Sequence, residues 1–217
     1  MTTRFSRFSA AVVILLLMLS AAATLRWGFW PRPVNARHAS VAKGGDTVSG
    51  QSLYQLESVW TTDRNEPLEL VELRGRYTIL SLIFTRCSGT CPLLVKQLQV
   101  FGASLPPDIG NQTRFVAITI DPADTSDMLL QYRREMRLDE RQWTLLRGEP
   151  GAVRELAAVL GFNYAPSDDQ SDNSQFSHSN LLTVLNPRGE IIHQQQGSGS
   201  NLRELLRVMT GTEPKDL

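Results

Sequence analysis

Two nearly continuous apolar runs constrain the fold of this chain more than any other feature. The first, YTILSLIF, covers residues 77–84, and the second, RFVAITI, covers residues 114–120. Runs of this kind, rich in β-forming residues, predict strands that are buried in the centre of a sheet. Segments with helical spacing of apolar residues follow each run, at residues 92–105 and 125–138. Buried strands that alternate with helices indicate an α/β layer fold.

The rest of the chain extends this alternation. We expect short strands or strand-like segments at residues 54–63, 67–75 and 143–148, helices at 151–161 and 201–209, and strands at 180–185 and 190–196. The last two strands flank NPRG, which is a hairpin turn signal. This order of elements predicts a thioredoxin-like α/β fold with an N-terminal strand extension.

The only two cysteines, Cys87 and Cys91, directly follow the first buried run, in FTRCSGTCPLL. Ligand sites of open α/β sheets lie at the carboxyl ends of strands. Backbone N–H groups at the start of a helix lower the pKa of a thiol, and Arg86 beside Cys87 would act in the same direction. The i, i+4 spacing suits a disulfide staple, a redox switch or two corners of a metal site. A chain of 217 residues with 41% hydrophobic residues can fill a core without a staple, so the switch and the metal site remain.

A metal site would need a third ligand, and the chain has three histidines: His38, His178 and His193. His38 falls in a linker, and His193 falls inside the second strand of the expected hairpin. His178 follows the polar loop at 166–175 and precedes a strand that we expect beside the central one. The topology therefore brings His178 towards both thiols. Two thiolates and one imidazole suit Cu(I) and would also accept Zn(II).

The N-terminus differs in composition from the rest of the chain. Arg4 and Arg7 precede an uncharged apolar run at residues 9–25, which Trp27, Phe29 and Trp30 follow. Two interpretations remain open: a retained membrane anchor or a cleaved signal segment. We therefore expect an anchor or signal at residues 1–30, a linker at 31–50 and the folded domain at 51–217, which faces the periplasm or an equivalent extracytoplasmic space. The 22 basic and 22 acidic residues cancel, which argues against a nucleic-acid partner.

Three motifs together, FTRCSGTCPLL, AITIDP and FSHSNLLTVLNPRGEII, resemble the SCO/SenC family over about residues 45–210. The resemblance implies a thioredoxin-like, membrane-anchored protein that helps to assemble the binuclear copper centre of cytochrome c oxidase. It also implies copper ligands at Cys87, Cys91 and His178. One departure is visible, because TIDPADTSDML has a shorter acidic run than the family's usual pattern, with Ser126 where proline is common. For Asp121 and Asp124 we expect a helix-capping role, with Asp124 or Thr125 as the N-cap.

The leading hypothesis is therefore a copper-binding assembly factor rather than an enzyme. Its expected partners are a copper donor protein, the copper-bearing subunit of the oxidase and the membrane. The alternative is a thiol–disulfide reductase in which Cys87 attacks and Cys91 resolves. A redox or copper sensor is a third hypothesis. A peroxidase of the peroxiredoxin kind is disfavoured, because no proline precedes Cys87 at the spacing of that class.

Overall fold

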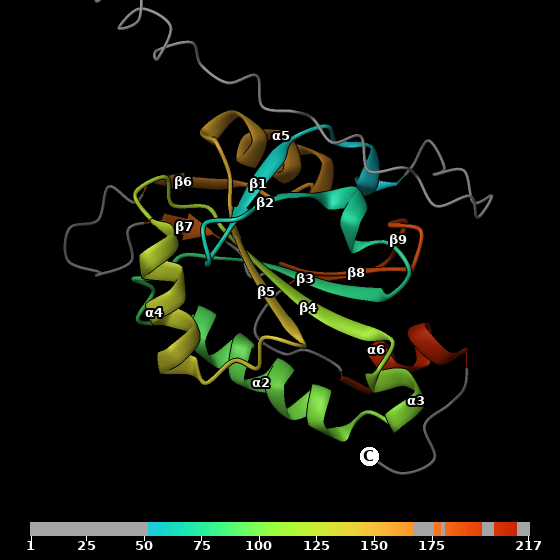
Figure 1. Cartoon of the computed structure of the whole chain (residues 1–217). Helices are drawn as coiled ribbons and strands as arrows, with labels where there is room; N and C mark the ends of the chain where they lie inside the picture. The colour runs from blue at the N-terminus through green and yellow to red at the C-terminus, as the bar shows by residue number, and fades with distance from the viewer. Residues whose placement is uncertain (1–51, 167–175, 179–180, 197–201, 212–217) are drawn as a thin grey trace, which may run out of the picture. The chain divides into compact units, whose positions relative to one another are not determined.

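The computed structural model describes residues 52–166, 176–178, 181–196 and 202–211. For residues 165, 166, 176–178 and 202, the description covers the backbone alone. A seven-stranded sheet runs through the molecule in the order β2-β1-β5-β4-β3-β8-β9 (Figure 1). Helices cover both of its faces, which confirms the mixed α/β layer fold expected from the sequence.

The centre of the sheet is parallel and buried. It consists of β3 (Tyr77–Ile83), β4 (Thr113–Thr119) and β5 (Trp143–Arg147). Ile79 pairs with Phe115, and Phe115 pairs with Trp143, whose ring stacks on that of Phe115 at a centroid distance of 4.8 Å. These strands carry the apolar runs that the sequence marks as buried, because both of their faces pack under helices.

Antiparallel strands extend the sheet at both edges. β8 (Leu181–Leu185) pairs with β3 and forms a hairpin with β9 (Ile191–Gln196). Gly189, in the turn between them, has φ +83, and a Cβ there would lie 2.3 Å from the Tyr54 ring, so that only glycine fits. On the other side, β1 (Val59–Thr62) pairs with β5 and with β2 (Pro67–Glu69), which confirms the N-terminal strand extension.

The N-terminal segments contain less strand than the sequence suggests. Parts of the two segments expected at 54–63 and 67–75 form 3₁₀ turns instead, η2 (Leu53–Gln55) and η3 (Leu70–Leu73). Leu53, Leu70 and Leu73 are buried in the core. The turn η3 places Leu70 and Leu73, which are three residues apart, on the same side of the backbone, whereas an alternating strand would turn them to opposite faces.

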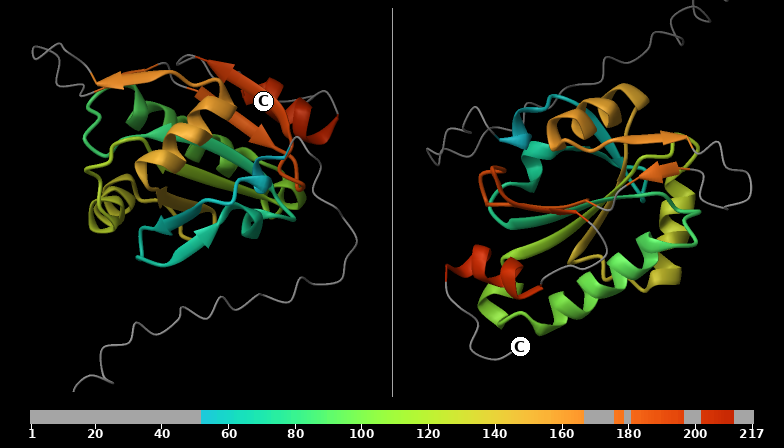
Figure 2. Two further views of the ribbon diagram at one scale, coloured as in Figure 1. Left: turned by 90° about the horizontal axis from the view of Figure 1, so that it is seen from above. Right: turned by 180° about the vertical axis from the view of Figure 1, so that it is seen from behind.

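The helices lie in two layers. α2 (Thr90–Ser104) and α4 (Ser126–Met136) lie on one face of the sheet, and α5 (Pro150–Leu160) lies on the other (Figures 1 and 2). The short helix α3 (Pro107–Gly110) follows α2, and α6 (Leu202–Thr210) packs against β9. The apolar face expected for α2 is confirmed, because these residues are buried: Leu94, Leu98, Phe101 and Leu105.

A separate two-stranded ribbon flanks the polar loop. β6 (Tyr164–Pro166) pairs antiparallel with β7 (Phe176–His178), and neither strand belongs to the main sheet. His178 lies between the polar loop and β8, as the sequence places it, and is the last residue of β7, a short strand that the sequence does not predict. The ribbon lies at the edge of the molecule where β3 ends and α4 begins (Figures 1 and 2).

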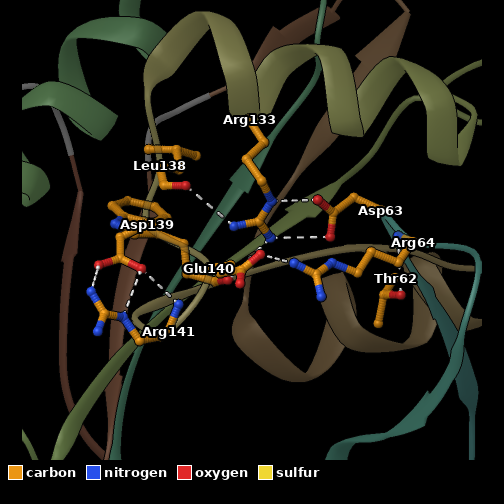
Figure 3. Close-up of polar contacts among 9 residues, drawn as sticks. Thr62, Asp63, Arg64, Arg133, Leu138, Asp139, Glu140 and Arg141 are labelled. Atoms are coloured by element: carbon orange, nitrogen blue, oxygen red, sulfur yellow. Dashed lines mark hydrogen bonds and ion pairs between the residues drawn. The ribbon is translucent and has the colours of Figure 1, made fainter.

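A buried ion pair fixes α4 to the sheet. The guanidinium of Arg133 makes two hydrogen bonds to the carboxylate of Asp63, which follows β1 (Figure 3). It also donates to the carbonyl oxygen of Trp143 at 3.1 Å. The sequence predicts one apolar side for this helix, formed by Met128, Leu129, Tyr132 and Met136. Leu129 and Tyr132 are buried in the core and Met136 packs against it, but Arg133 is buried in addition, which the apolar pattern does not predict. A charged side chain is tolerated there because each of the three guanidinium nitrogens has a hydrogen-bond partner, including the carbonyl oxygen of Leu138 at 3.5 Å.

Residues 1–51 lie outside the described part, and the expected anchor or signal segment lies with them. Among the described residues, no helix is long and apolar enough to cross a bilayer.

Candidate functional site

The two cysteines lie where the sequence places them, at the carboxyl end of the central strand. Cys87 sits in a tight turn just after β3, in which its N–H donates to the carbonyl oxygen of Phe84 at 3.2 Å. Cys91 is the second residue of α2, and Pro92 occupies the first turn as predicted. Gly89 precedes the helix and provides no side-chain cap, so the positive end of the helix adjoins the thiols without a carboxylate to neutralise it.

The two thiols are reduced and differ in exposure. Cys87 is half-buried, whereas Cys91 is only 1% exposed. The pKa of Cys91 is raised, first because its S–H hydrogen-bonds to the sulfur of Cys87, then by burial and by the charge of Cys87. Backbone groups of Phe84 and Cys91 act in the opposite direction. Cys91 is therefore the sulfur that keeps its proton more tightly, and the more accessible Cys87 is the sulfur that an incoming reactant reaches first.

A carboxylate from the segment between β4 and α4 holds the loop that leads to Cys87. Asp124 is 1% exposed and accepts from the backbone N–H of Thr85 at 2.9 Å and from the hydroxyl of Thr85 at 2.5 Å. The oxygen that accepts the N–H of Thr85, Oδ2, also accepts from the hydroxyl of Thr119 at 2.5 Å. Asp124 thus joins the end of β4 to the turn beside the thiols. The N-cap of α4 is Thr125, whose hydroxyl accepts from the N–H of Met128.

A second carboxylate, that of Asp121, holds Arg86, the residue between Thr85 and Cys87. Asp121 is 4% exposed, and its carboxylate accepts a hydrogen bond from Arg86 at 2.6 Å. Its other oxygen accepts from the N–H of Ala123. A capping role for Asp121 or Asp124 is therefore wrong: both carboxylates brace the loop of the cysteines. The charge of Arg86 is directed to Asp121, which weakens the effect that the sequence assigns to it on Cys87.

No local pattern in the sequence identifies these braces. Thr85 and Asp124 are 39 residues apart, as their hydrogen bond records. The one available signal is topological, because β3 and β4 are adjacent parallel strands and both segments leave the sheet at the same edge.

The position of His178 is described at the level of its backbone. His178 pairs with Tyr164 across the β6–β7 ribbon. Tyr164 lines a cavity of about 340 Å³ together with Asp121 and Pro122, which belong to the segment that braces the cysteine loop. Among the side chains that the structure describes, no three of the types His, Cys, Asp and Glu are gathered as a metal site, and the imidazole of His178 lies outside that set. Its role as a ligand stays a prediction.

The other two histidines do not compete for this role in the described part. His193 pairs with Val184 in the β8–β9 hairpin, in the second strand as predicted, and its side chain is half-buried. His38 lies in the expected linker, outside the described residues.

Comparison with known proteins identifies relatives at the level of the family. A family model for SCO1/SenC matches residues 51–210 of this chain. A protein of Stutzerimonas stutzeri named "Putative copper-binding protein" is 30% identical over 142 residues, which cover 65% of this chain and 67% of that protein.

Solved structures agree with this assignment of the fold. Arabidopsis thaliana ScoI with copper bound superposes with a TM-score of 0.61 at 18% identity, covering 71% of this chain and 97% of that chain. BsSco, described as a member of the Sco family of cytochrome c oxidase assembly proteins with a disulfide switch, superposes with a TM-score of 0.59 at 17% identity. It covers 79% of this chain and 100% of that chain. These likenesses show the fold. The match of the family model over residues 51–210 shows that the chain belongs to the SCO1/SenC family.

Proposed function

We propose that this chain binds copper through Cys87, Cys91 and His178 and delivers it to the copper-bearing subunit of cytochrome c oxidase. The observation that carries the proposal is the reduced thiol pair at the end of β3, whose sulfurs already share a hydrogen bond. Membership of the SCO1/SenC family and the name of the Stutzerimonas relative support copper as the cargo.

The chemistry of the donor set suits this cargo. Thiolates are soft ligands that prefer Cu(I), and one imidazole completes a three-ligand site. Binding requires the loss of both thiol protons to solvent, since the thiolate is the form that binds metal. The half-buried Cys87 offers an incoming ligand one accessible position, so that copper can be passed on by stepwise ligand exchange.

The braced loop supports the same proposal. Asp124 and Asp121 hold Thr85 and Arg86, the two residues before Cys87, at 2.5–2.9 Å. A site whose supporting residues are fixed loses less conformational entropy when it binds its cargo.

Copper loading followed by transfer tests the proposal. The reduced full chain in detergent is loaded with Cu(I) and mixed with the apo form of the oxidase subunit that bears the binuclear centre. We expect transfer of copper to the subunit, and we expect none from the Cys87→Ser/Cys91→Ser variant because it takes up no copper. Tight copper binding by that double variant would contradict the assignment of the site.

A second candidate function rests on the difference in exposure between the two thiols. The Cys87 thiolate would attack a disulfide of the target protein and expel one target thiolate. The Cys91 sulfur, after losing its proton to solvent, would then attack Cys87 in the mixed disulfide and release the second target thiolate. The target gains two electrons and this chain ends with a Cys87–Cys91 disulfide, which an external dithiol would have to reduce before another turnover.

Copper delivery and disulfide reduction differ in whether they need His178. A reductase needs both cysteines and has no use for an imidazole, so His178→Ala would keep the rate at which the chain reduces an oxidised target. Loss of copper transfer with unchanged target reduction in that variant would show that the same sulfurs serve both functions.

We also propose the location that the sequence suggests. The apolar run at residues 9–25 would hold the chain at a membrane or direct its export, with the domain at 51–217 in the periplasm or an equivalent space. Protease accessibility of the domain in intact spheroplasts tests this placement, since a cytoplasmic domain would be protected.

A further inference from the structure

One buried hydroxyl, on the helix that packs against the helix of Cys91, has no role in the site described so far. Tyr132 lies on α4, is 4% exposed and belongs to the hydrophobic core. In the part of the chain that the structure describes, its hydroxyl oxygen is buried and has no hydrogen-bond partner. An unsatisfied buried donor is unfavourable, and phenylalanine would fill the same space without it.

The surroundings of this hydroxyl include both cysteines. The pKa of Tyr132 is raised, first by burial and then by the charges of Cys91 and Cys87. The placement follows from the packing of α4 on α2, the helix that carries Cys91 in its first turn (Figure 1). The side chain of Gln99 on α2 donates to the carbonyl oxygen of Met136 at 2.9 Å and holds the two helices together.

The neighbouring residue fixes the helix that presents Tyr132. Arg133 makes the buried pair with Asp63 (Figure 3). It also donates to the carbonyl oxygen of Trp143, so α4 is tied to the sheet at the residue that follows Tyr132. The phenol is therefore carried by a rigid element that packs against the helix of Cys91, and not by a loop.

We propose that Tyr132 is a positioning residue that donates its hydroxyl hydrogen to the sulfur of Cys91 when copper is bound. The inference rests on the proposed function and deepens it. In the free dithiol, the S–H of Cys91 hydrogen-bonds to the sulfur of Cys87 and needs no other donor. Copper binding removes both thiol protons to solvent and leaves a buried, negatively charged sulfur on Cys91. The phenol of Tyr132 then donates a hydrogen bond to this sulfur and compensates part of its buried charge.

This role predicts a specific pair of effects on the sulfur. A donated hydrogen bond stabilises the thiolate and retains the metal. It also lowers the energy of the sulfur lone pairs, so that light-driven transfer of an electron from sulfur to Cu(II) requires more energy. Both effects disappear in Tyr132→Phe, which keeps the ring and removes the oxygen.

The chain offers a matched control in Tyr54. Its hydroxyl is also buried, but it donates to the carbonyl oxygen of Leu73 at 3.1 Å and lies 3.2 Å from the hydroxyl oxygen of Thr78, away from the cysteines. Tyr54→Phe therefore removes a buried phenol oxygen that has hydrogen-bond partners, whereas Tyr132→Phe removes one that has none among the described residues. We expect Tyr54→Phe to lower the melting temperature and leave metal binding unchanged, whereas Tyr132→Phe leaves the melting temperature unchanged or raises it.

The experiment compares both variants with the unmodified full chain in detergent. Competition with a chromophoric Cu(I) chelator measures affinity, and the absorption spectrum of the Cu(II) form measures the sulfur-to-copper band. We expect Tyr132→Phe to bind Cu(I) about tenfold more weakly, as for the loss of one hydrogen bond to a charged atom, and to shift the band to longer wavelength. Unchanged affinity and band position in Tyr132→Phe, or equal changes in Tyr54→Phe, would overturn the proposal.

Cd(II) separates this inference from the proposed function. If the unmodified chain takes up no copper, the proposed function fails, and the sulfur-to-cadmium band of the two thiolates still reports on Tyr132. Weaker Cd(II) binding and a shifted band in Tyr132→Phe alone would support the hydrogen bond. The same Cd(II) affinity and band in all three proteins would overturn it.

Discussion

Asp124 accepts both the backbone N–H and the hydroxyl of Thr85, and so ties the end of β4 to the loop that carries Cys87. The same carboxylate accepts from Thr119, and it is buried. The geometry of the thiol pair therefore depends on a residue that is not itself a candidate ligand.

Replacing Asp124 with asparagine should destabilise the domain and weaken copper binding. The amide keeps one acceptor oxygen and turns an NH₂ group towards donors, which leaves buried groups unpaired. We expect a loss of about 1–3 kcal/mol in the free energy of unfolding, measured by urea denaturation. Asp127→Asn is the control, because Asp127 is exposed and lies in the first turn of α4, the helix that follows Asp124. Equal stability of the two variants would argue against the brace.

Removing Arg133 should have a larger effect. Arg133→Met leaves the carboxylate of Asp63 buried without its partner, and we expect a loss of about 3–5 kcal/mol in the free energy of unfolding. Arg134→Met, at the exposed neighbouring position, should change stability by less than about 0.5 kcal/mol.

A double variant tests whether the loss comes from the unpaired charge. Asp63→Leu/Arg133→Met removes both charges, and it should recover most of the stability that Arg133→Met loses. A double variant that is less stable than either single variant would show that the two residues contribute independently.

The raised pKa of Cys91 predicts a loss of stability at alkaline pH. An acid whose pKa is higher in the folded state binds its proton more tightly there, so its contribution is complete below the unfolded pKa of about 8.5 and declines as pH rises above it. Tyr54 and Tyr132 also have raised pKa values, and their contributions decline only above about pH 10. Urea unfolding under reducing conditions should show a falling stability from about pH 8.5 to 10.

Cys91→Ala is the matching variant for the pH experiment. It lacks the thiol, so its stability should stay level over the window in which the unmodified chain becomes less stable. Parallel curves for the two proteins would assign the alkaline loss to other groups.

The sequence predicts the central sheet well because β3 and β4 are long, apolar and buried on both faces. The same holds for Cys87 and Cys91, whose position depends only on the order of strand and helix. The β6–β7 ribbon is missed because polar residues fill the segment between its strands and carry no periodic signal. The Asp63–Arg133 pair joins residues 70 positions apart, and nothing in either local sequence indicates that a charged side chain on α4 is buried.

The roles of residues that can make more than one kind of contact are the hardest to predict from the sequence. Tyr132 belongs to the apolar face of its helix, and the sequence assigns it to the core, where its ring does lie. Its hydroxyl becomes informative only when the thiols of another helix are placed beside it. Asp124 is similar, because its position before α4 suggests a cap, whereas the adjacent parallel strand provides a stronger set of donors.

The central claim is that His178 completes a copper site with the two cysteines, and Cu(I) competition titration of His178→Ala tests it most directly. The reduced full chain should bind one equivalent of Cu(I) tightly, and so should the control His193→Gln. His178→Ala should lose stoichiometric binding, while oxidation of Cys87 and Cys91 to a disulfide stays intact by mass spectrometry. Unchanged Cu(I) stoichiometry and affinity in His178→Ala would contradict the account.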